Sequence, residues 1–287
     1  MDVLVLGGGP AGATAAIYAA RSGKAVTLVY QDSGALARAE RIENFYGFPA
    51  PISGPDLFRQ GLEQVRSLGV TVKEAQILSL GFGAHGLEAE TTQGTLAAPA
   101  VVLATGAQRR RPRIPGLDDF DGAGVSYCAV CDGFFCRGKE VAVLGAGTYA
   151  LHEAGVLLPL AKRVTLLTNG DPAPEELPQD LVLDTRPIAA LVGESGILSA
   201  VRFADGGALE VCRLFVALGT AGSGDLARKV GLLTENGKIV VDGTMATNVP
   251  GLFAAGDCTG GLLQVCKAVY EGALAATEAI KQIRGKK

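Results

Sequence analysis

The stretch DVLVLGGGPAGATAAIYAARSGKAVTLVY, residues 2–30, decides the fold. Its apolar run 3–6 predicts a buried strand, followed at once by the glycine turn 7–12. The small residues that follow predict a helix, and the apolar run 26–30 predicts a second strand. Glycines let the backbone approach a pyrophosphate, and the helix N-terminus supplies N–H donors. The stretch therefore predicts a dinucleotide-binding domain.

The same pattern occurs again in EVAVLGAGTYALHEAGVLLPLAKRVTLLT, residues 140–168. Tyr30 follows Gly7 by the same number of residues as Thr168 follows Gly145. Each copy continues with a hairpin and a buried strand that ends in glycine, in residues 94–106 and 207–219. Two copies in one context predict an α/β fold with two Rossmann-like domains, each a parallel sheet plus a β-meander. For the second copy, a tight turn without a ligand is the alternative.

A third segment, MATNVPGLFAAGDCTGGLLQVCKAVYEGALAATEAI, closes the chain at residues 245–280. It predicts one short strand, a Gly-Asp turn and a helix, which is too little for a separate domain. We therefore expect this segment to return to the first domain. The expected domains are residues 1–111 with 239–287, and an inserted domain of residues 112–238.

Composition excludes several functional classes. The chain has 287 residues, 48% hydrophobic content and a net charge of −3, and only the run 109–113 concentrates basic residues. Nucleic-acid binding is therefore not expected. We expect no secretory signal, and the sequence has no apolar run of about 20 residues, the length that spans a bilayer. We expect a soluble, cytoplasmic protein whose six cysteines are redox-active or buried rather than structural disulfides.

The motif SYCAVCDGFFC, residues 126–136, brings thiols and an acid together. Cys128 and Cys131 lie within disulfide reach across one turn, and a helix that begins there would favour a thiolate. Asp132 is positioned to move a proton during dithiol exchange. Zinc binding is an alternative, but it needs a second pair of ligands beyond Cys136. Two buried, inert cysteines are the other alternative.

These motifs carry a resemblance. GGGPAGATAAIYAAR, IENFYGFP, ATGA, the CxxCD motif and TNVPGLFAAGD run the length of the chain. Together they resemble the low-molecular-weight thioredoxin reductases. The resemblance implies an FAD domain interrupted by a second nucleotide domain that carries the redox disulfide, with thioredoxin as the protein substrate.

The resemblance also implies roles for individual residues. Cys131 would be the thiol beside the flavin, Cys128 would attack the protein substrate, and Asp132 would be the acid–base group. The implied FAD contacts are Gly7, Gly9 and Gly12 at the pyrophosphate, Asn44 near the flavin, Thr105 and Gly106 in the cleft, and Gly256 with Asp257 at the ribitol chain.

Two FAD-side positions depart from the family pattern. The usual GGQ turn reads SGAL here, so that Ala35 replaces the glutamine. The usual RQ pair after the Gly-Asp turn is Leu263-Gln264. Two polar contacts at the flavin site are therefore expected to differ, although Ala35 and Gln264 keep their places in the site.

The second nucleotide site departs further. NADPH-dependent members carry an arginine-rich HRRxxxR segment, whose guanidinium groups hold the 2′-phosphate. This chain reads LTNGDPAPEELP from Leu167, with neither arginine nor lysine. An NADH enzyme would prefer an acid at Thr168, and Asp171 would serve only if its loop folded back. In the glycine turn, Tyr149 replaces a small serine where a phosphate would approach.

The sequence therefore favours a disulfide reductase whose electron donor is not NADPH. It is closest in character to the ferredoxin-dependent flavin thioredoxin reductases, which implies reduced ferredoxin as donor and a homodimer. The alternatives are an NADH- or NADPH-dependent reductase with a degenerate site, a dithiol oxidase that passes electrons to oxygen, and a non-enzymatic redox switch.

Overall fold

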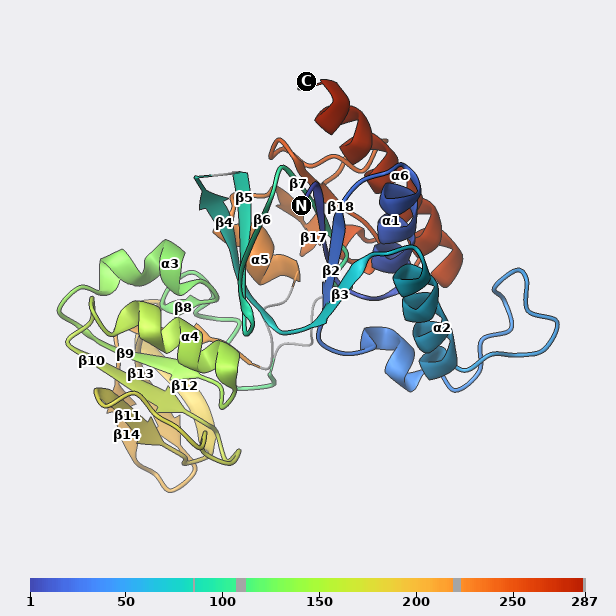
Figure 1. Ribbon diagram of the computed structural model, residues 1–287. Helices are drawn as coiled ribbons and strands as arrows, with labels where there is room; N and C mark the ends of the chain where they lie inside the picture. The colour runs from blue at the N-terminus through green and yellow to red at the C-terminus, as the bar shows by residue number, and fades with distance from the viewer. Residues whose placement is uncertain (85, 107–111, 219–222, 286–287) are drawn as a thin grey trace. The chain divides into compact units, whose positions relative to one another are not determined.

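The computed structural model describes residues 1–84, 86–106, 112–218 and 223–285. The chain forms two compact units, Met1–Arg109 with Gly222–Lys287, and Arg110–Ala221 (Figure 1). The protein is an α/β protein with two Rossmann-like domains, the second inserted into the first. The expected first junction borders residues 107–111, which lie outside the described residues, as does most of the basic run 109–113.

The second junction differs from the expected boundary at residue 239. Residues 222–238 group with the first unit, because helix α5 (Ser223–Lys229) packs against strand β4 (Ile77–Gly83) of that unit. The Lys229 ammonium donates to the Leu78 carbonyl oxygen at 3.1 Å. Leu226 is fully buried. The sequence between 219 and 239 carries no signal that separates a domain end from a connecting helix.

The first unit is built on a parallel sheet in the order β18-β7-β1-β2-β3. Its strands are β1 (Val3–Leu6), β2 (Val26–Tyr30), β3 (Thr71–Glu74), β7 (Ala100–Leu103) and β18 (Leu252–Ala254). Strands β1 and β7 are buried at every position, as their unbroken apolar runs predict for central parallel strands. Strand β18 pairs with β7, so the closing segment returns to the first domain as the sequence predicts.

Helices α1 (Pro10–Arg21) and α6 (Val265–Gly285) pack against each other on this sheet (Figure 1). Small residues make the close approach possible, since a Cβ on Gly272 would run into the Ala11 carbonyl. Ala15, Ala16, Ala275 and Ala276 are all fully buried. Ser53 is the N-cap of helix α2 (Gly54–Ser67), and its hydroxyl accepts a hydrogen bond from the Asp56 backbone N–H.

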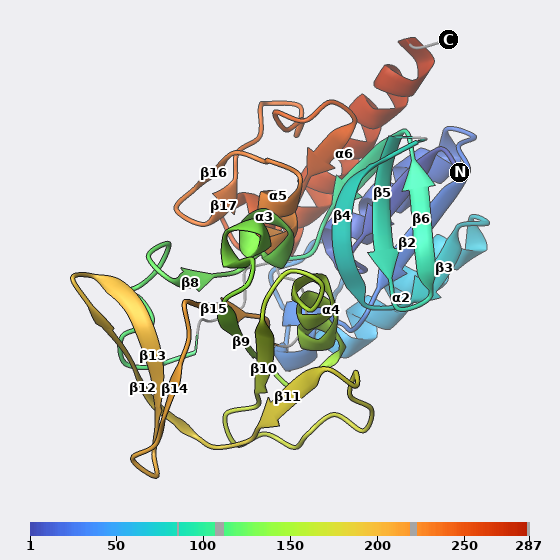
Figure 2. The same ribbon diagram turned by 90° about the vertical axis from the view of Figure 1, so that its left-hand side faces the viewer.

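The remaining elements of the first unit are short or lie in a separate meander. Strands β4, β5 (Gly86–Thr91) and β6 (Gly94–Ala98) form an antiparallel three-stranded sheet, which Figure 2 shows face on. The short elements are η1 (Gly34–Arg38), β16 (Thr234–Glu235), β17 (Lys238–Ile239) and η3 (Asp257–Thr259).

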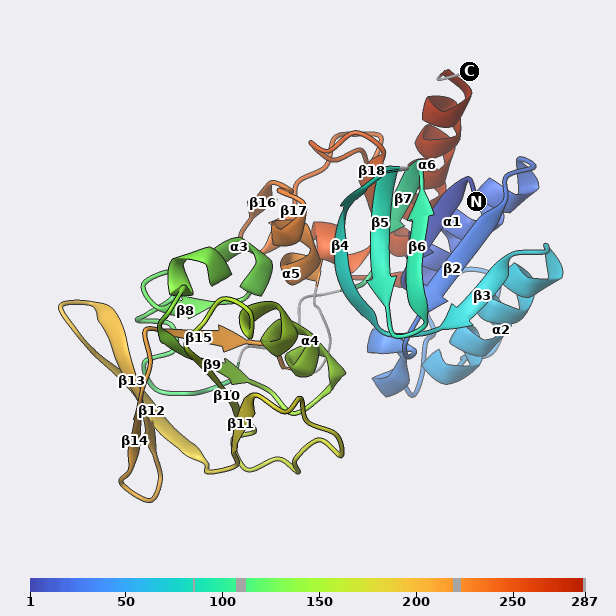
Figure 3. The ribbon, with the colours of Figure 1, turned by 60° about the vertical axis from the view of Figure 1, so that its left-hand side comes forward.

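The second unit repeats the plan with a parallel sheet in the order β11-β10-β9-β15-β8. Its strands are β8 (Val125–Ser126), β9 (Glu140–Leu144), β10 (Arg163–Leu167), β11 (Leu181–Asp184) and β15 (Arg213–Val216). Helix α4 (Thr148–Leu157) follows the glycine turn after β9. The meander is β12 (Ile188–Glu194), β13 (Ile197–Phe203) and β14 (Ala208–Glu210) (Figure 3).

The Cys-x-x-Cys segment of the second unit forms helix α3 (Ala129–Asp132), which continues into η2 (Gly133–Cys136). Helix α3 packs on α4. Across the described residues of the whole chain, no helix combines the length and apolar content needed to cross a membrane.

Candidate active site

A disulfide joins Cys128 and Cys131, with 5.3 Å between their Cα atoms. Cys128 is the N-cap of α3, and its sulfur accepts the Cys131 backbone N–H at 3.1 Å. An N–H donor stabilises a thiolate at this sulfur once the disulfide is reduced. Cys128 is buried, only 2% exposed, whereas Cys131 is exposed. The two sulfurs therefore differ in both access and stabilisation.

A buried carboxylate on a neighbouring helix holds the start of the disulfide helix. Glu153 on α4 accepts the Ala129 backbone N–H at 2.8 Å and is 1% exposed. Ala129 is the first residue of α3, so its N–H has no partner within the helix. Sequence reasoning left Glu153 without a role, because the link joins residues 24 positions apart.

The acid of the motif, Asp132, is bound by an arginine from the sheet. The Arg213 guanidinium donates to the Asp132 carboxylate at 3.0 Å, and both side chains are partly exposed. Arg213 begins β15, so the pair ties the disulfide segment to that strand. Val130, Phe134 and Phe135 are each more than half exposed around the disulfide.

The glycine turn of the first unit meets two other loops at the carboxyl ends of adjacent strands β1, β7 and β18. A Cβ on Gly7 would run into the Ala104 carbonyl, and a Cβ on Gly12 would run into the Gly7 carbonyl. By contrast, nothing lies within 4 Å of a Cβ built on Gly9. Gly7 and Gly12 are thus required by chain packing, while Gly9 faces open space.

Polar groups around this turn are left for a ligand. No side chain caps the N-terminus of α1, so its first amides face outward. The Thr105 hydroxyl is buried and has no hydrogen-bond partner among the described residues. Gly106 follows in the left-handed region, with φ of 74°. Buried polar groups are normally paired, so an unpaired hydroxyl beside outward amides fits a polar ligand such as a pyrophosphate.

The Gly256-Asp257 turn is fixed by two charged side chains from α6. The Glu271 carboxylate accepts from the Gly256 N–H at 2.8 Å, and the Lys267 ammonium donates to the Gly256 carbonyl oxygen at 2.9 Å. Lys267 and Glu271 also pair with each other at 3.0 Å. Asp257 is half-buried and starts η3. Neither Lys267 nor Glu271 was singled out from sequence, although they share one helix face.

The three remaining positions expected to contact FAD lie on the surface. Asn44 and Gln264 are brought together by a 2.8 Å hydrogen bond, across 220 positions of sequence, in which the Asn44 side-chain amide nitrogen donates to the Gln264 side-chain oxygen Oε1. Both are exposed, and so is Ala35 on η1. Leu36 belongs to a small buried cluster with Ile42 and Ile52, against which Val265 packs. Positions 35, 44 and 264 therefore share one neighbourhood.

The second glycine turn has the same backbone requirement but a bulky neighbour. Gly145 has φ of 152°, and a Cβ there would run into the Ala217 carbonyl. Tyr149, in the first turn of α4, is 1% exposed and is among the largest fully buried side chains. A tyrosine ring thus packs inside the protein where the first copy has the small residue Ala11.

The residue that follows β10 is closed off from solvent. Thr168 is fully buried, and its hydroxyl has no hydrogen-bond partner among the described residues. The turn after it is tied down by main-chain bonds, with Gly170 N–H donating to the Thr185 carbonyl oxygen at 3.0 Å. The Asn169 side-chain oxygen accepts the Ile188 N–H at 2.6 Å. Asp171 is exposed.

The arginine that follows β11 is already paired. Arg186 binds the Asp184 carboxylate at 2.7 Å and the Asp205 carboxylate at 3.2 Å. Its guanidinium also lies 3.9 Å from the centre of the Phe203 ring. The hydrogen bonds from Arg186 hold the pKa of Asp184 below its usual value. This guanidinium is committed to two carboxylates and is not free for a phosphate.

The four other cysteines have different surroundings. Cys258 is buried, and burial raises the pKa of its thiol to about 12, so it is inert at neutral pH. Cys266 is exposed. Cys136 is buried, and Cys212 is half-buried. Cys212 lies in a bend between β14 and β15, where the chain passes from the meander to the sheet.

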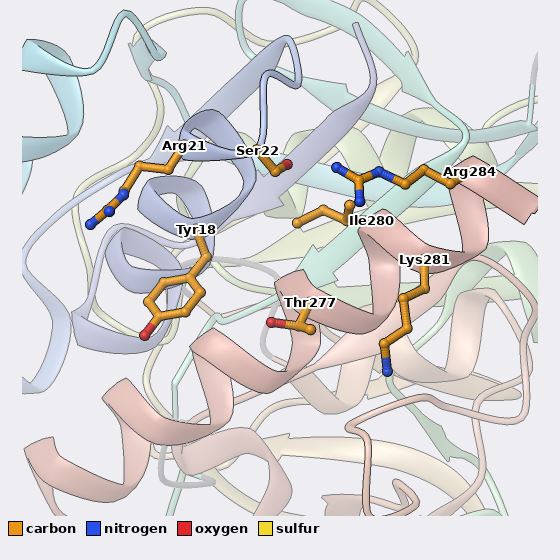
Figure 4. A pocket seen from close by; sticks show the side chains of 7 residues that line it. All are labelled: Tyr18, Arg21, Ser22, Thr277, Ile280, Lys281 and Arg284. Atoms are coloured by element: carbon orange, nitrogen blue, oxygen red, sulfur yellow. The ribbon is translucent and has the colours of Figure 1, made fainter.

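A cavity of about 510 Å³ lies between the last turns of α1 and α6 (Figure 4). It is lined by Tyr18, Arg21, Ser22, Thr277, Ile280, Lys281 and Arg284. These residues are at the end of α1 opposite to the glycine turn. The cavity is therefore separate from the glycine turn and its neighbouring loops.

Comparison with known proteins gives one consistent result. Residues 1–272 match the family described as pyridine nucleotide-disulphide oxidoreductase. The chain is 35% identical to a thioredoxin reductase of Aquifex aeolicus (strain VF5), over 100% of this chain and 94% of that protein.

Two solved structures are also similar. One is the atypical thioredoxin reductase TRi from Desulfovibrio vulgaris Hildenborough, with a TM-score of 0.93, 39% identity, and coverage of 99% of this chain and 98% of that one. The other is a ferredoxin-flavin thioredoxin reductase from Clostridium acetobutylicum, with a TM-score of 0.75, 30% identity, and coverage of 99% and 98%.

The fold and the Cys128–Cys131 disulfide define a flavin-dependent disulfide oxidoreductase. The chain belongs to the pyridine nucleotide-disulphide oxidoreductase family, and FAD is its cofactor. The outward amides of α1 and the unpaired Thr105 hydroxyl fit this cofactor.

Proposed function

We propose that this protein is a thioredoxin reductase that receives electrons from reduced ferredoxin rather than from NADPH or NADH. Electrons would pass to FAD, then to the Cys128–Cys131 disulfide, and on to the disulfide of thioredoxin. The choice of donor rests on the surroundings of the residues that follow β10. There Thr168 is buried, and Arg186, the nearest arginine that follows, is held by Asp184 and Asp205.

Recognition of NADPH needs a guanidinium or ammonium group free to meet the 2′-phosphate. Recognition of NADH needs an accessible acid at the end of the second strand, where the ribose hydroxyls lie. Thr168 meets neither requirement, and Asp171 lies beyond a hydrogen-bonded turn. Tyr149 fills the space beside the glycine turn. These features argue against both nucleotides.

We propose that the FAD site is formed by the positions inferred from sequence. Gly7, Gly9 and Gly12 would face the pyrophosphate with the first amides of α1. The other contacts would come from Ala35, Asn44, Thr105, Gly106, Gly256, Asp257 and Gln264. FAD, when bound, supplies the two-electron couple between the donor and the disulfide. Lys267 and Glu271 would position the Gly256 turn without touching the reacting atoms.

The chemistry of the cysteines follows from their surroundings. Cys131 is exposed, so we assign to its sulfur the role of accepting electrons from the flavin. Cys128, whose sulfur accepts an N–H bond, would then be the thiolate that attacks thioredoxin. Its burial means that this attack requires the Cys128 sulfur to become accessible once the disulfide opens. Cys131 would resolve the mixed disulfide, and Asp132 would carry the proton.

The exposed side chains of Val130, Phe134 and Phe135 support a protein substrate. Exposed apolar side chains that gather in one place commonly mark protein contacts. They lie on or next to the four-residue helix that bears the disulfide. We further propose that the protein is cytoplasmic, because a dithiol stays reduced in that compartment. We also propose a homodimer, as the family resemblance implies.

The decisive experiment is anaerobic reduction of the bound flavin, which is monitored through the loss of its visible absorbance. Reduced ferredoxin should bleach the flavin within the turnover time, while NADPH and NADH at millimolar concentrations should leave it oxidised. Rapid bleaching by either nucleotide at micromolar concentration would overturn the choice of donor. The Cys128→Ser and Cys131→Ser variants should still be bleached by ferredoxin but should not reduce thioredoxin.

A further inference from the structure

Two cysteines without an assigned role lie together beside the redox motif. Cys136 ends η2, directly after the disulfide helix, and Cys212 directly precedes β15. The main chain brings them together, because Lys139 N–H donates to the Cys136 carbonyl oxygen at 3.0 Å and Cys212 N–H donates to the Glu140 carbonyl oxygen at 2.9 Å. Their side chains are within hydrogen-bonding reach of each other.

The pair is also linked to the acid of the redox motif. The Cys136 sulfur contacts the Asp132 carbonyl oxygen at 3.7 Å. Arg213, the residue after Cys212, donates to the Asp132 carboxylate at 3.0 Å. A bond between the two sulfurs would therefore close beside the existing Asp132–Arg213 ion pair.

We propose that Cys136 and Cys212 form a second disulfide when the protein meets a low-molecular-weight disulfide, and that this bond restrains Asp132 against Arg213. The inference concerns the inserted unit alone and does not depend on the electron donor. It assigns a modification site to two thiols outside the Cys-x-x-Cys motif.

The two thiols have unequal access, which sets the order of the steps. Burial, and then the neighbouring Cys212, raises the pKa of the Cys136 thiol to about 11, so Cys136 remains a thiol at neutral pH. Cys212 is half-buried and lines a shallow depression of about 420 Å³ together with Lys139, Lys162 and Ser199. A small disulfide therefore meets Cys212 first.

The exchange balances without another reactant. The Cys212 thiolate attacks one sulfur of the small disulfide, forming a mixed disulfide and releasing one thiol. The Cys136 sulfur then attacks the Cys212 sulfur and breaks the mixed disulfide. The proton of Cys136 passes to the second thiol as it leaves. Two protein thiols are oxidised, and one small disulfide is reduced to two thiols.

The test uses the FAD-loaded protein, oxidised glutathione as the probe, and tryptic digestion without reductant. The wild type should give a covalent adduct of peptide 114–137, which contains Cys136, with peptide 203–213, which contains Cys212. The Cys136→Ser variant should instead keep one glutathione on peptide 203–213. The Cys212→Ser variant should give neither product. The exposed thiol of Cys266 should carry glutathione in all three proteins, which controls for the reagent.

The peptide readouts do not require turnover, so failure of the Cys136–Cys212 pairing is distinguishable from failure of the proposed function. Absence of the adduct in the wild type, or its persistence in Cys136→Ser, would overturn the pairing. Activity tests the restraint: thioredoxin reduction should fall at least severalfold in treated wild type and stay unchanged by treatment in Cys212→Ser. Full activity of the cross-linked wild type would overturn the restraint on Asp132.

Discussion

The Glu153 carboxylate accepts a hydrogen bond from the Ala129 backbone N–H at 2.8 Å, inside the protein. This bond connects the helix after the second glycine turn to the helix that bears the redox disulfide. It gives α4 a structural role that does not depend on a nucleotide. The position of the disulfide helix thus depends on a side-chain acceptor that touches neither sulfur.

Replacing Glu153 tests this link. Glu153→Leu should lower the free energy of unfolding by about 2 kcal/mol, since it leaves a buried N–H without an acceptor. Glu153→Gln keeps a side-chain oxygen and should lose less than half of that. Urea unfolding measures both variants. Equal losses in Gln and Leu would mean that the charge, rather than the acceptor, matters.

The glycine turn of the first unit offers a matched pair of substitutions. A Cβ on Gly9 meets open space, while a Cβ on Gly12 meets the Gly7 carbonyl. Gly9→Ala should therefore fold normally but bind FAD about tenfold more weakly or worse, because the methyl enters the pyrophosphate site. Gly12→Ala should destabilise the apoprotein by about 1–3 kcal/mol. FAD titration and thermal unfolding separate the two effects, and normal FAD affinity in Gly9→Ala would contradict this placement.

The buried hydroxyl of Thr105 makes a second test of the flavin site. Thr105→Val should stabilise the apoprotein by about 1 kcal/mol, because it removes an unpaired polar group, and should weaken FAD binding about fivefold. Thr168→Val is the control, since that hydroxyl is also buried and unpartnered but lies in the other unit. Its stability should rise without any change in FAD affinity. Weaker FAD binding in Thr168→Val alone would refute this assignment.

Acid stability tests the charge cluster after β11. Arg186 holds the pKa of Asp184 below its ordinary value of 3.8, so this pair stabilises the fold above about pH 4. The contribution is lost as the pH falls through the lower value in the folded state. Arg186→Met should lower the free energy of unfolding modestly at pH 6, because the guanidinium is part-exposed, and much less at pH 3.

The control for this experiment is Lys162→Met, which removes the more exposed ion pair with Glu140. Urea unfolding at the two pH values should show no pH-dependent difference for that variant. A cost for Arg186→Met that is the same at pH 3 and pH 6 would show that packing on Phe203, rather than the ion pair, stabilises this region.

The roles of the two redox cysteines are tested by trapping. Cys131→Ser should accumulate a mixed disulfide with a single-cysteine thioredoxin whose remaining thiol is activated as a disulfide with thionitrobenzoate. The Cys128 thiolate displaces thionitrobenzoate, and no second cysteine is present to resolve the product. Cys128→Ser should accumulate none. Non-reducing electrophoresis measures the adduct. The opposite pattern would make the exposed Cys131 the attacking thiol.

Much of the architecture could be predicted from sequence because it rests on local patterns. The apolar runs of β1 and β9, the glycine turns after them and the helices that follow all lie within about thirty residues of sequence. The return of residues 252–254 to the first sheet could be predicted because the closing segment is too short to bury a core of its own. The spacing of Cys128 and Cys131 predicts that the two thiols lie within disulfide reach, and the family resemblance implied the disulfide itself.

The contacts that support the site could not be predicted in the same way. Glu153 reaches Ala129, and Arg213 reaches Asp132, only because α4 and β15 pack beside the disulfide helix. The expected boundary at residue 239 differs from the observed one because the sequence pattern of a short helix such as α5 does not show which domain it packs on. Long-range packing, rather than local propensity, decides each of these cases.

Gly145 shows why a glycine motif does not by itself identify a bound nucleotide. Its missing side chain leaves room for the Ala217 carbonyl, where two strands and a helix converge, as Gly7 leaves room for Ala104 in the other unit. The packing of the chain requires such a glycine whether or not a nucleotide binds. In the inserted domain, the first glycine of the motif therefore indicates the fold. Only the residues around it bear on whether a nucleotide binds.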